Sequence, residues 1–190
     1  MTLSWTVIET PLGQISAGCS ATGVADVRFG PPPPGAPLAV ADDAVVGNAV
    51  VGNAVSAAHD QLAEYFSGTR HGFDLALDWG TASSAARRVL SLLFETVGYG
   101  ETISYGALAR RLALRENGPE IPARAIGGIM GSNPIPVIVP CHRVVAADGL
   151  GGFSGGTGVE FKRWLLTFEG ALPAMLDFGP PAYSGLLRDR

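Results

Sequence analysis

The sequence has 190 residues, of which 47% are hydrophobic and 16% charged, and its formal net charge is −4. These values suit one large folded domain or two small ones and exclude an intrinsically disordered chain. No apolar stretch is long enough to span a bilayer, so we expect no membrane partner. The two cysteines, Cys19 and Cys141, lie far apart, which argues against a disulfide framework and favours a reducing, cytoplasmic location.

The charge is divided unevenly along the chain. Residues 1–78 hold eight acidic and two basic residues, a balance of −6, whereas residues 79–190 hold nine acidic and eleven basic residues, a balance of +2. Such asymmetry is a weak indication of a charged partner for the second half. Any affinity for nucleic acid is therefore expected to be modest and sensitive to salt.

The first part of the chain shows a pattern typical of short strands. Apolar runs at residues 5–8, 14–19 and 24–29 are separated by turn residues, which predicts an antiparallel meander. The proline-rich segment 31–37 predicts a stiff linker or long loop. Residues 45–49 (VVGNA) recur at 50–54, a tandem copy too short for a solenoid repeat. Over residues 54–66 the apolar spacing becomes helical.

Three consecutive helices are predicted between residues 80 and 132. Apolar residues at i, i+3, i+4 and i+7 mark the first over residues 90–97, ahead of Gly98. Ser104 is a predicted N-cap of the second helix, over residues 105–112, and Pro122 lies at the first turn of the third. Two short helices around a turn resemble a helix-turn-helix, and the third helix carries small residues that permit close approach to a surface. Ordinary helix packing explains the same small residues equally well, so the pattern leaves both interpretations open.

Cys141 is the strongest candidate for a chemically reactive residue. It lies in PCHR (residues 140–143), directly after the apolar, proline-framed run NPIPVIV (residues 133–139). Cationic neighbours favour the thiolate, which is the reactive form of cysteine. The ordinary alternative is a buried structural cysteine, but His142 and Arg143 would be costly neighbours in an apolar interior. The glycine-rich residues 148–158 that follow allow the backbone to approach a ligand closely.

Other kinds of site find little support in the sequence. The three histidines and two cysteines show no metal-ligand spacing, so we predict no metal. The glycine run lacks the last glycine of the dinucleotide-binding fingerprint, and no phosphate-binding loop motif occurs. Covalent chemistry at the sulfur of Cys141 remains.

A nucleophilic thiol needs a base and an acid that orients the base. Neighbouring residues of an extended chain point to opposite sides, so His142 serves Cys141 only if the chain turns sharply after Pro140 or if a water carries the proton. Glu169 is the candidate acid. A helical stripe of Phe161, Trp164, Leu165 and Phe168 predicts a fourth helix that ends at Gly170. Glu169 lies at the C-terminal end of this helix, where a carboxylate is unfavourable, although a frayed surface glutamate explains this position as well.

These residues resemble the active-site signature of the O6-alkylguanine-DNA alkyltransferase family, and the resemblance spans roughly residues 1–172. It is dense after residue 98 and looser before it. The matching segments are GETISYGALA (residues 100–109), ARAIGGIM (123–130), PCHR (140–143), KRWLLTFEG (162–170) and, in the N-terminal part, QLAEYFSG (61–68). The resemblance implies an α+β fold with a small antiparallel-sheet, ribonuclease H-like domain (residues 1–80). A mostly helical, winged helix-turn-helix-like domain (81–172) and a tail (173–190) follow.

The resemblance also implies a single-turnover DNA repair protein that needs no cofactor. The alkyl group of O6-alkylguanine, or of O4-alkylthymine, passes irreversibly to Cys141 after the base is flipped out of the duplex. His142 accepts the thiol proton through a water, Glu169 holds the imidazole, Tyr105 donates toward the leaving base, and Asn133 braces the loop. The implied partner is double-stranded DNA with alkylated bases, bound through its minor groove by a monomer that can cluster on DNA.

Nine further residues are implied in substrate or DNA binding. Arg124 fills the position that the base leaves, and Val145 and Ser154 bind the flipped base through backbone groups. The full set is Arg124, Ala123, Ala125, Gly127, Met130, Arg143, Val145, Phe153 and Ser154. This sequence departs from the family pattern at Phe153, where tyrosine is usual, and at residues 113–121, which predict a longer turn between the DNA-facing helices.

Two alternative functions belong to other classes. One is a non-catalytic sensor that binds alkylated bases; family members of that kind lack the cysteine that is present here. The other is a thiol hydrolase that uses Cys141, His142 and Glu169 for multiple turnover. Gain of one methyl group on Cys141 separates repair from both alternatives.

Overall fold

A computed structural model of the chain describes residues 2–39, 49–80, 82–156 and 158–173. The described residues form two compact units. The first holds residues 2–70 and 74–78, and the second holds residues 71–73 and 79–173. No helix among the described residues is both long and apolar enough to cross a membrane.

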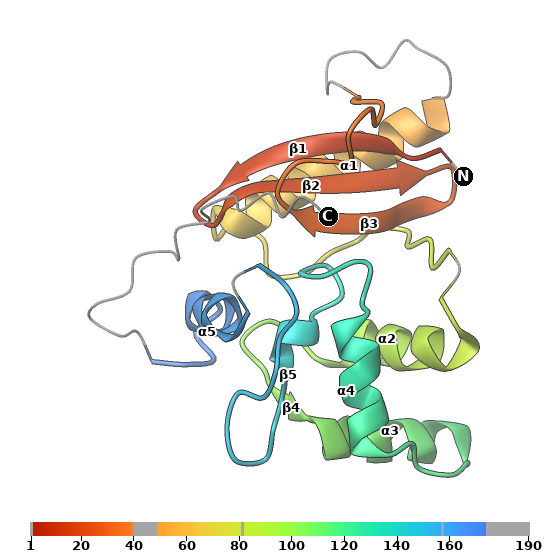
Figure 1. Ribbon diagram of the computed structural model, residues 1–190, viewed down its shortest axis with the longest axis vertical. Helices are drawn as coiled ribbons and strands as arrows, with labels where there is room; N and C mark the ends of the chain where they lie inside the picture. Colours follow the sequence, from red (N-terminus) through yellow and green to blue (C-terminus); the bar gives the residue numbers. More distant parts are fainter. Residues whose placement is uncertain (1, 40–48, 81, 157, 174–190) are drawn as a thin grey trace. The chain divides into compact units, whose positions relative to one another are not determined.

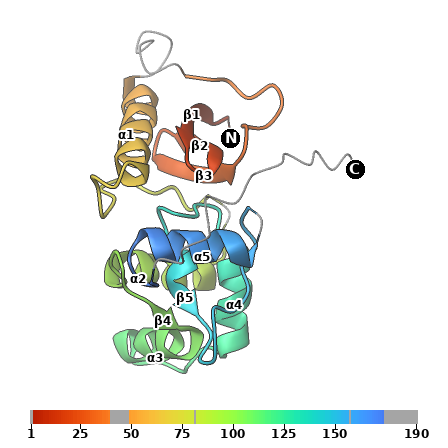
Figure 2. The same cartoon turned by 90° about the vertical axis from the view of Figure 1, so that its left-hand side faces the viewer.

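The first unit is a three-stranded antiparallel sheet with one helix against it. The strands β1 (Ser4–Thr10), β2 (Gly13–Ser20) and β3 (Gly23–Phe29) pair in the order β1-β2-β3, so the predicted meander is confirmed. Helix α1 (Ala49–Phe66) lies along one face of this sheet (Figures 1 and 2). It begins five residues before the predicted start, and it includes the second copy of the tandem repeat; most of the first copy lies outside the described residues.

The core between the sheet and α1 consists of apolar side chains from alternate strand positions. Ile15, Ala17 and Cys19 of β2 are fully buried, and Leu62 and Tyr65 of α1 are buried opposite them. Side chains two apart on a strand point to the same face, which is why the alternating pattern of β2 gives the sheet one apolar side. This unit therefore derives its stability from packing.

The second unit is mostly helical. Helices α2 (Ser84–Thr96), α3 (Tyr105–Glu116) and α4 (Ala123–Gly131) pack around a short parallel pair, β4 (Ile103–Ser104) and β5 (Val144–Val145), and α5 (Val159–Phe168) completes the unit (Figure 2). The predicted cap of α3 is confirmed, since Ser104 Oγ accepts a hydrogen bond from the amide of Ala107 at 3.1 Å. The β4–β5 pair places the start of α3 beside the residues that follow Cys141.

The turn between α3 and α4 is shorter than the sequence predicted. Residues 113–116, expected to belong to the turn, continue α3 as its last turn of helix. Asn117 then ends the helix in the left-handed conformation, with φ 49°, which asparagine tolerates better than most residues. The connection to α4 is therefore residues 117–122, and Pro122 occupies the N-cap of α4.

Candidate active site

The loop before Cys141 is held by an asparagine. Asn133 Nδ2 donates to the carbonyl of Val139 at 2.9 Å, while Asn133 Oδ1 accepts from the amide of Ile135 at 3.1 Å. Within this loop Val137 is buried with φ 73°, a conformation that costs a β-branched residue energy. The surrounding packing therefore fixes the backbone that delivers the thiol.

The chain turns sharply at the thiol. Cys141–Arg143 is one turn of 3-10 helix, closed by a hydrogen bond from the amide of Arg143 to the carbonyl of Pro140 at 2.9 Å. Of the two arrangements considered from the sequence, this is the sharp turn after Pro140. Burial raises the pKa of the Cys141 thiol, whereas a hydrogen bond involving Asn133 and the charge of Lys162 act to lower it. The resting sulfur is thus a protonated thiol with groups nearby that stabilise its anion.

Glu169 lies directly behind the thiol turn, not at the surface. Its side chain is fully buried, and its Oε1 lies 2.9 Å from His142 Nε2. Arg143 contributes a two-pronged ion pair, with Nε donating to Oε2 at 2.9 Å and Nη2 donating to Oε1 at 2.8 Å. The helix α5 ends at Phe168, and Glu169 is its C-cap.

The protonation states of this buried group follow from its surroundings. Burial alone would raise the pKa of Glu169, but hydrogen bonds and charge from His142 and Arg143 outweigh it, so the pKa lies well below its ordinary value. Burial lowers the pKa of His142, and the nearby carboxylate offsets this only in part. We therefore assign a neutral His142 that donates its Nε2–H to Glu169, whose charge is balanced by Arg143.

This assignment leaves His142 Nδ1 as an acceptor. Among the buried side-chain nitrogen and oxygen atoms of the described residues, only Ser16 Oγ and His142 Nδ1 are without a hydrogen-bond partner. An unpaired buried acceptor is costly. A ring nitrogen of this kind, one residue from a thiol, is suited to accept a proton.

Cys141 opens into a pocket of about 510 Å³. Its walls come from the start of α3, one face of α4 and the glycine-rich segment before α5. The lining residues are Tyr105, Ala123, Arg124, Gly127, Met130, Gly131, Cys141, Gly152, Phe153 and Ser154. The glycines and alanine leave room for a flat, base-sized ligand against the backbone.

Most of the predicted site residues meet at or behind this pocket. Seven of the predicted binding and catalytic residues line it beside Cys141, and Ser154 Oγ also donates to the carbonyl of Gly131 at 2.9 Å. Asn133, His142 and Glu169 lie behind the thiol. Ala125 is exposed on α4 outside the lining set, and Val145 is half-buried in β5.

Arg143 does not fit the predicted role in substrate or DNA binding. Only 6% of the residue is exposed, and its third guanidinium nitrogen, Nη1, donates to the carbonyl of Val97 at 2.8 Å. All three nitrogens are therefore bound to Glu169 or to the 97–100 loop. The correction has a simple cause: a buried carboxylate needs a cation, and Arg143 is the one that satisfies it.

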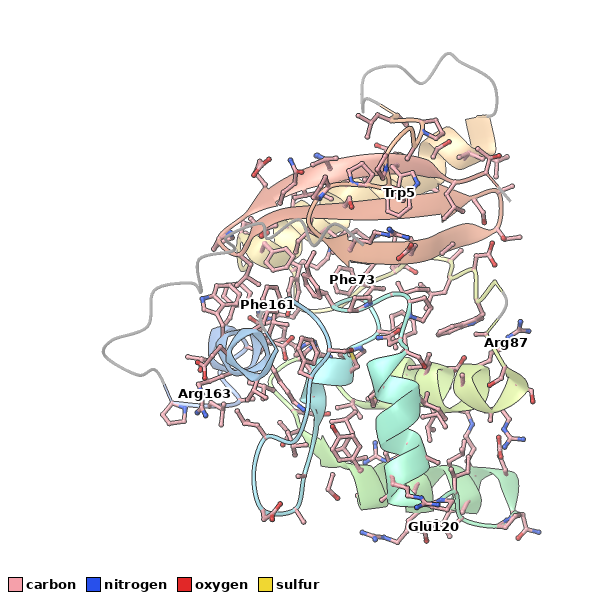
Figure 3. All side chains as sticks on the ribbon, in the orientation of Figure 1. Trp5, Phe73, Arg87, Glu120, Phe161 and Arg163 are labelled. Atoms are coloured by element: carbon pink, nitrogen blue, oxygen red, sulfur yellow. The ribbon has the colours of Figure 1, made fainter. Side chains whose placement is uncertain are left out.

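Lys162 was not singled out from the sequence. It is fully buried in α5, and its Nζ donates to the carbonyls of Val144 at 2.6 Å and Gly152 at 3.3 Å. Burial lowers the pKa of Lys162 from 10.5 to about 8, although the nearby Cys141 acts in the opposite direction. Its neighbours in sequence, Phe161 and Arg163, leave α5 in different directions (Figure 3).

The fold and the site together define a protein with a thiol nucleophile. Cys141 lines a pocket of about 510 Å³, and the buried His142–Glu169 pair begins at the next residue of the chain. The described residues contain no cluster of three or more histidine, cysteine, aspartate or glutamate side chains that could hold a metal ion.

Comparisons with known proteins identify the family. The model of the family described as "6-O-methylguanine DNA methyltransferase, DNA binding domain" matches residues 84–171. A mouse methylated-DNA–protein-cysteine methyltransferase is 48% identical over 103 residues, which cover 54% of this chain and 44% of that protein. A DNA base-flipping protein of Thermus thermophilus is 46% identical over 115 residues, covering 60% of this chain and 71% of that protein.

Solved structures agree over nearly the whole chain. The O6-methylguanine methyltransferase of Mycobacterium tuberculosis has a TM-score of 0.69 and 33% identity, covering 92% of this chain and 96% of that one. The same organism's protein in complex with DNA has a TM-score of 0.70 and 32% identity, covering 88% and 93%. The chain belongs to the O6-methylguanine-DNA methyltransferase family.

Proposed function

We propose that the protein repairs alkylated DNA by moving the alkyl group of O6-alkylguanine, and of O4-alkylthymine, irreversibly to Cys141. The observation that carries this proposal is that Cys141 lines the pocket while the adjacent His142 is paired with the buried Glu169. Each protein molecule acts once, because a thioether is not hydrolysed.

The chemistry balances without a cofactor. The Cys141 proton passes to His142 Nδ1, directly or through a water, and the thiolate attacks the alkyl carbon. The new bond joins Sγ to that carbon, and the bond between the carbon and O6 breaks with its electron pair left on the base. The base anion then gains one proton and the His142 imidazolium loses one, so the dealkylated base, guanine or thymine, and a neutral thioether are the products. Glu169 stabilises the imidazolium that forms on the way, and Arg143 keeps this carboxylate ionised.

The pocket supplies groups for the leaving base. Tyr105 donates toward the base as negative charge develops on it, and its hydroxyl now donates to the carbonyl of Gly152 at 3.4 Å. Phe153 provides an aromatic face, where the family usually has tyrosine. The backbone of Val145 and Ser154 is proposed to bind the base edge, and Asn133 is proposed to hold the loop before the thiol.

The DNA partner is proposed to approach through α4. Ala123, Gly127 and Gly131 recur every four residues and give this helix a small-residue face suited to the minor groove. Arg124, which lines the pocket, is proposed to fill the place of the flipped base. Ala125, exposed on α4 outside the pocket lining, is proposed to contact the DNA, and the buried Met130 lines the pocket. Helices α3 and α4, with the six-residue connection between them, support a helix-turn-helix element, and the β4–β5 pair supports a wing.

The domain boundaries are part of the same proposal. Residues 1–80 form a structural domain of ribonuclease H type, supported by the sheet with α1, and residues 81–172 form the alkyltransferase and DNA-binding domain. The tail, residues 173–190, lies almost wholly outside the described residues. The protein acts as a monomer that can cluster on DNA, in the cytoplasm, where its two free thiols stay reduced.

A sensor function is the second candidate, because one relative is named a DNA base-flipping protein. Intact-mass measurement after incubation with a duplex that contains O6-methylguanine separates the two. Repair predicts a gain of one methyl group per protein, on the peptide that contains Cys141. Duplex binding without a change in mass supports the sensor, and turnover beyond one equivalent supports the thiol hydrolase.

A further inference from the structure

Lys162 is the only lysine in a chain that contains twelve arginines. Elsewhere this protein uses arginine wherever it needs a positive charge. Its one lysine is fully buried in α5 beside the candidate active site. Burying an ammonium group is costly unless it is well bonded. An ammonium differs from a guanidinium in being compact, with three donors around one nitrogen. We therefore expect this buried position to require a compact donor group.

The ammonium joins two segments that meet at the thiol. Lys162 Nζ donates to the carbonyl of Val144, the residue immediately after the 3-10 turn that carries Cys141. It also donates to the carbonyl of Gly152 in the glycine-rich wall of the pocket. One side chain therefore ties the wall that faces the ligand to the backbone that carries the nucleophile.

Tyr105 belongs to the same arrangement. Its hydroxyl donates to the Gly152 carbonyl, the second acceptor of Lys162, and Lys162 Nζ lies 5.8 Å from the centre of the Tyr105 ring. The wall runs very close to this ring. Gly151 has φ +70°, and a Cβ there would lie 3.0 Å from the tyrosine ring. The Lys162 ammonium and the Tyr105 hydroxyl thus share one acceptor, the Gly152 carbonyl, at the point where the wall passes close to the ring.

We propose that Lys162 is a positioning residue for alkyl transfer, which fixes the Gly152 wall and the Tyr105 ring relative to Cys141 and so sets how the alkylated base is held. This inference rests on the proposed repair function. The titratable groups that face the ammonium are Cys141, His142 and Tyr105. Because Lys162 also lowers the pKa of Cys141, its effect on the thiol must be measured separately from its effect on the pocket.

Two reactions of the full chain make this separation. The pH profile of iodoacetamide modification at Cys141 reports the pKa of the thiol without using the base pocket. Single-turnover methyl transfer from an O6-methylguanine duplex depends on both the thiol and the base pocket. Lys162→Met keeps the length of the side chain and removes its donors, and Lys162→Arg keeps the charge but changes its shape. Arg163→Met removes a neighbouring charge from α5 and is the matched control.

Compared at equal thiolate fraction, Lys162→Met and Lys162→Arg are expected to transfer methyl about 100-fold more slowly than the wild type, as misplacement of reacting groups by about 1 Å does in other enzymes. Arg163→Met is expected to keep the wild-type rate. Lys162 variants that transfer methyl at the wild-type rate overturn the inference. So do variants whose slower transfer is fully explained by a smaller thiolate fraction. A wild type that accepts no methyl group contradicts the proposed function instead.

A second measurement requires no substitution at Lys162. Protein labelled with ¹³C at the lysine ε-carbon contains a single labelled side chain, so its spectrum reports this residue alone. The inference predicts that the signal of the Cys141→Ala protein moves when an O6-methylguanine duplex binds, and less so with an unmodified duplex. A signal unchanged by bound methylated duplex overturns the proposal.

Discussion

The sheet unit and the helical unit bury different kinds of side chain. The buried polar residues of the sheet unit are uncharged hydroxyl residues: Thr6, Ser16 and Ser20. Those of the helical unit are ionisable: His142, Arg143, Lys162 and Glu169. Each unit also buries one free cysteine. The same amino acid is therefore placed in two interiors of opposite character.

The two cysteines show what this difference does. Burial raises the pKa of Cys19 from 9.0 to about 12, and its thiol donates a long hydrogen bond to the carbonyl of Ala54, at 3.6 Å. Burial also raises the pKa of Cys141, but there Asn133 and Lys162 act against it. Burial alone makes a thiol inert. Reactivity requires buried charge around it, which only the helical unit contains among the described residues.

Replacing each cysteine in turn tests this contrast most directly. Cys141→Ala is expected to abolish methyl transfer completely while leaving binding to a methylated duplex, because the sulfur contributes chemistry and not docking. Cys19→Ala is the matched control and is expected to keep one methyl per protein. Intact mass and duplex titration measure the two properties. Equal loss of binding and transfer in Cys141→Ala would contradict separate roles.

Glu169→Gln removes the carboxylate charge that is buried in the helical unit. Transfer is expected to slow by at least about 100-fold, because His142 loses the partner that stabilises its protonated form. The free energy of unfolding is expected to fall by about 3–5 kcal/mol, because Arg143 is left as an unpaired buried charge. Glu160→Gln, in the exposed first turn of the same helix, is the control for both measurements.

The same carboxylate gives the helical unit a dependence on acid. The pKa of Glu169 in the folded protein lies below its ordinary value of 4.5. Its contribution to stability is therefore complete above pH 4.5 and is lost as the pH falls below that value. Urea unfolding across this range is expected to show a steeper loss in the wild type than in Glu169→Gln; parallel curves would exclude the buried ion pair as the cause.

Tyr105→Phe tests a smaller contribution within the pocket. The phenyl ring keeps its place beside Gly151 and Lys162, and only the hydroxyl donor is removed. Methyl transfer is expected to slow roughly tenfold, the size of one uncharged hydrogen bond. Tyr99→Phe removes a hydroxyl that donates to the carbonyl of Phe168 outside the pocket, and it is expected to retain the wild-type rate. A similar loss in both variants would point to packing instead.

Cys19 supplies the smallest expected effect, on stability alone. Its folded pKa of about 12 exceeds the ordinary 9.0, so its contribution is present below pH 9 and declines as the pH rises toward 12. Cys19→Ala lacks this dependence. The difference in unfolding free energy between the wild type and Cys19→Ala is expected to shrink across that range. A constant difference would show that the thiol is not held neutral by burial.

Local patterns predicted the three-stranded meander and the positions of the helices, but not the short β4–β5 pair. The three strands and the α3 cap follow from turn residues, alternation and Ser104, which act over a few neighbouring positions. The end of α3 was predicted four residues too early, because Asn117 is a permissive helix terminator that composition does not reveal. The family resemblance, and not periodicity, supplied the grouping of Tyr105, Cys141 and Glu169.

The interior of the site was harder to predict, since it depends on contacts between distant segments. Arg143 was expected to bind substrate or DNA, whereas it binds the buried Glu169. Lys162 was counted only as one of the basic residues in the second half of the chain and was given no role. One signal was available: a single lysine among twelve arginines is a departure from the chain's own usage.

The left-handed backbone conformation of Val137 affects how the active site is lost on denaturation. A β-branched residue in the left-handed region costs about 1–2 kcal/mol, and only the packing around residues 133–139 holds it there. Once that packing loosens, the loop relaxes and Cys141 leaves its position. Methyl transfer to Cys141 and the packed core of the helical unit should therefore be lost in the same cooperative unfolding transition. No partly unfolded form that still transfers methyl is expected.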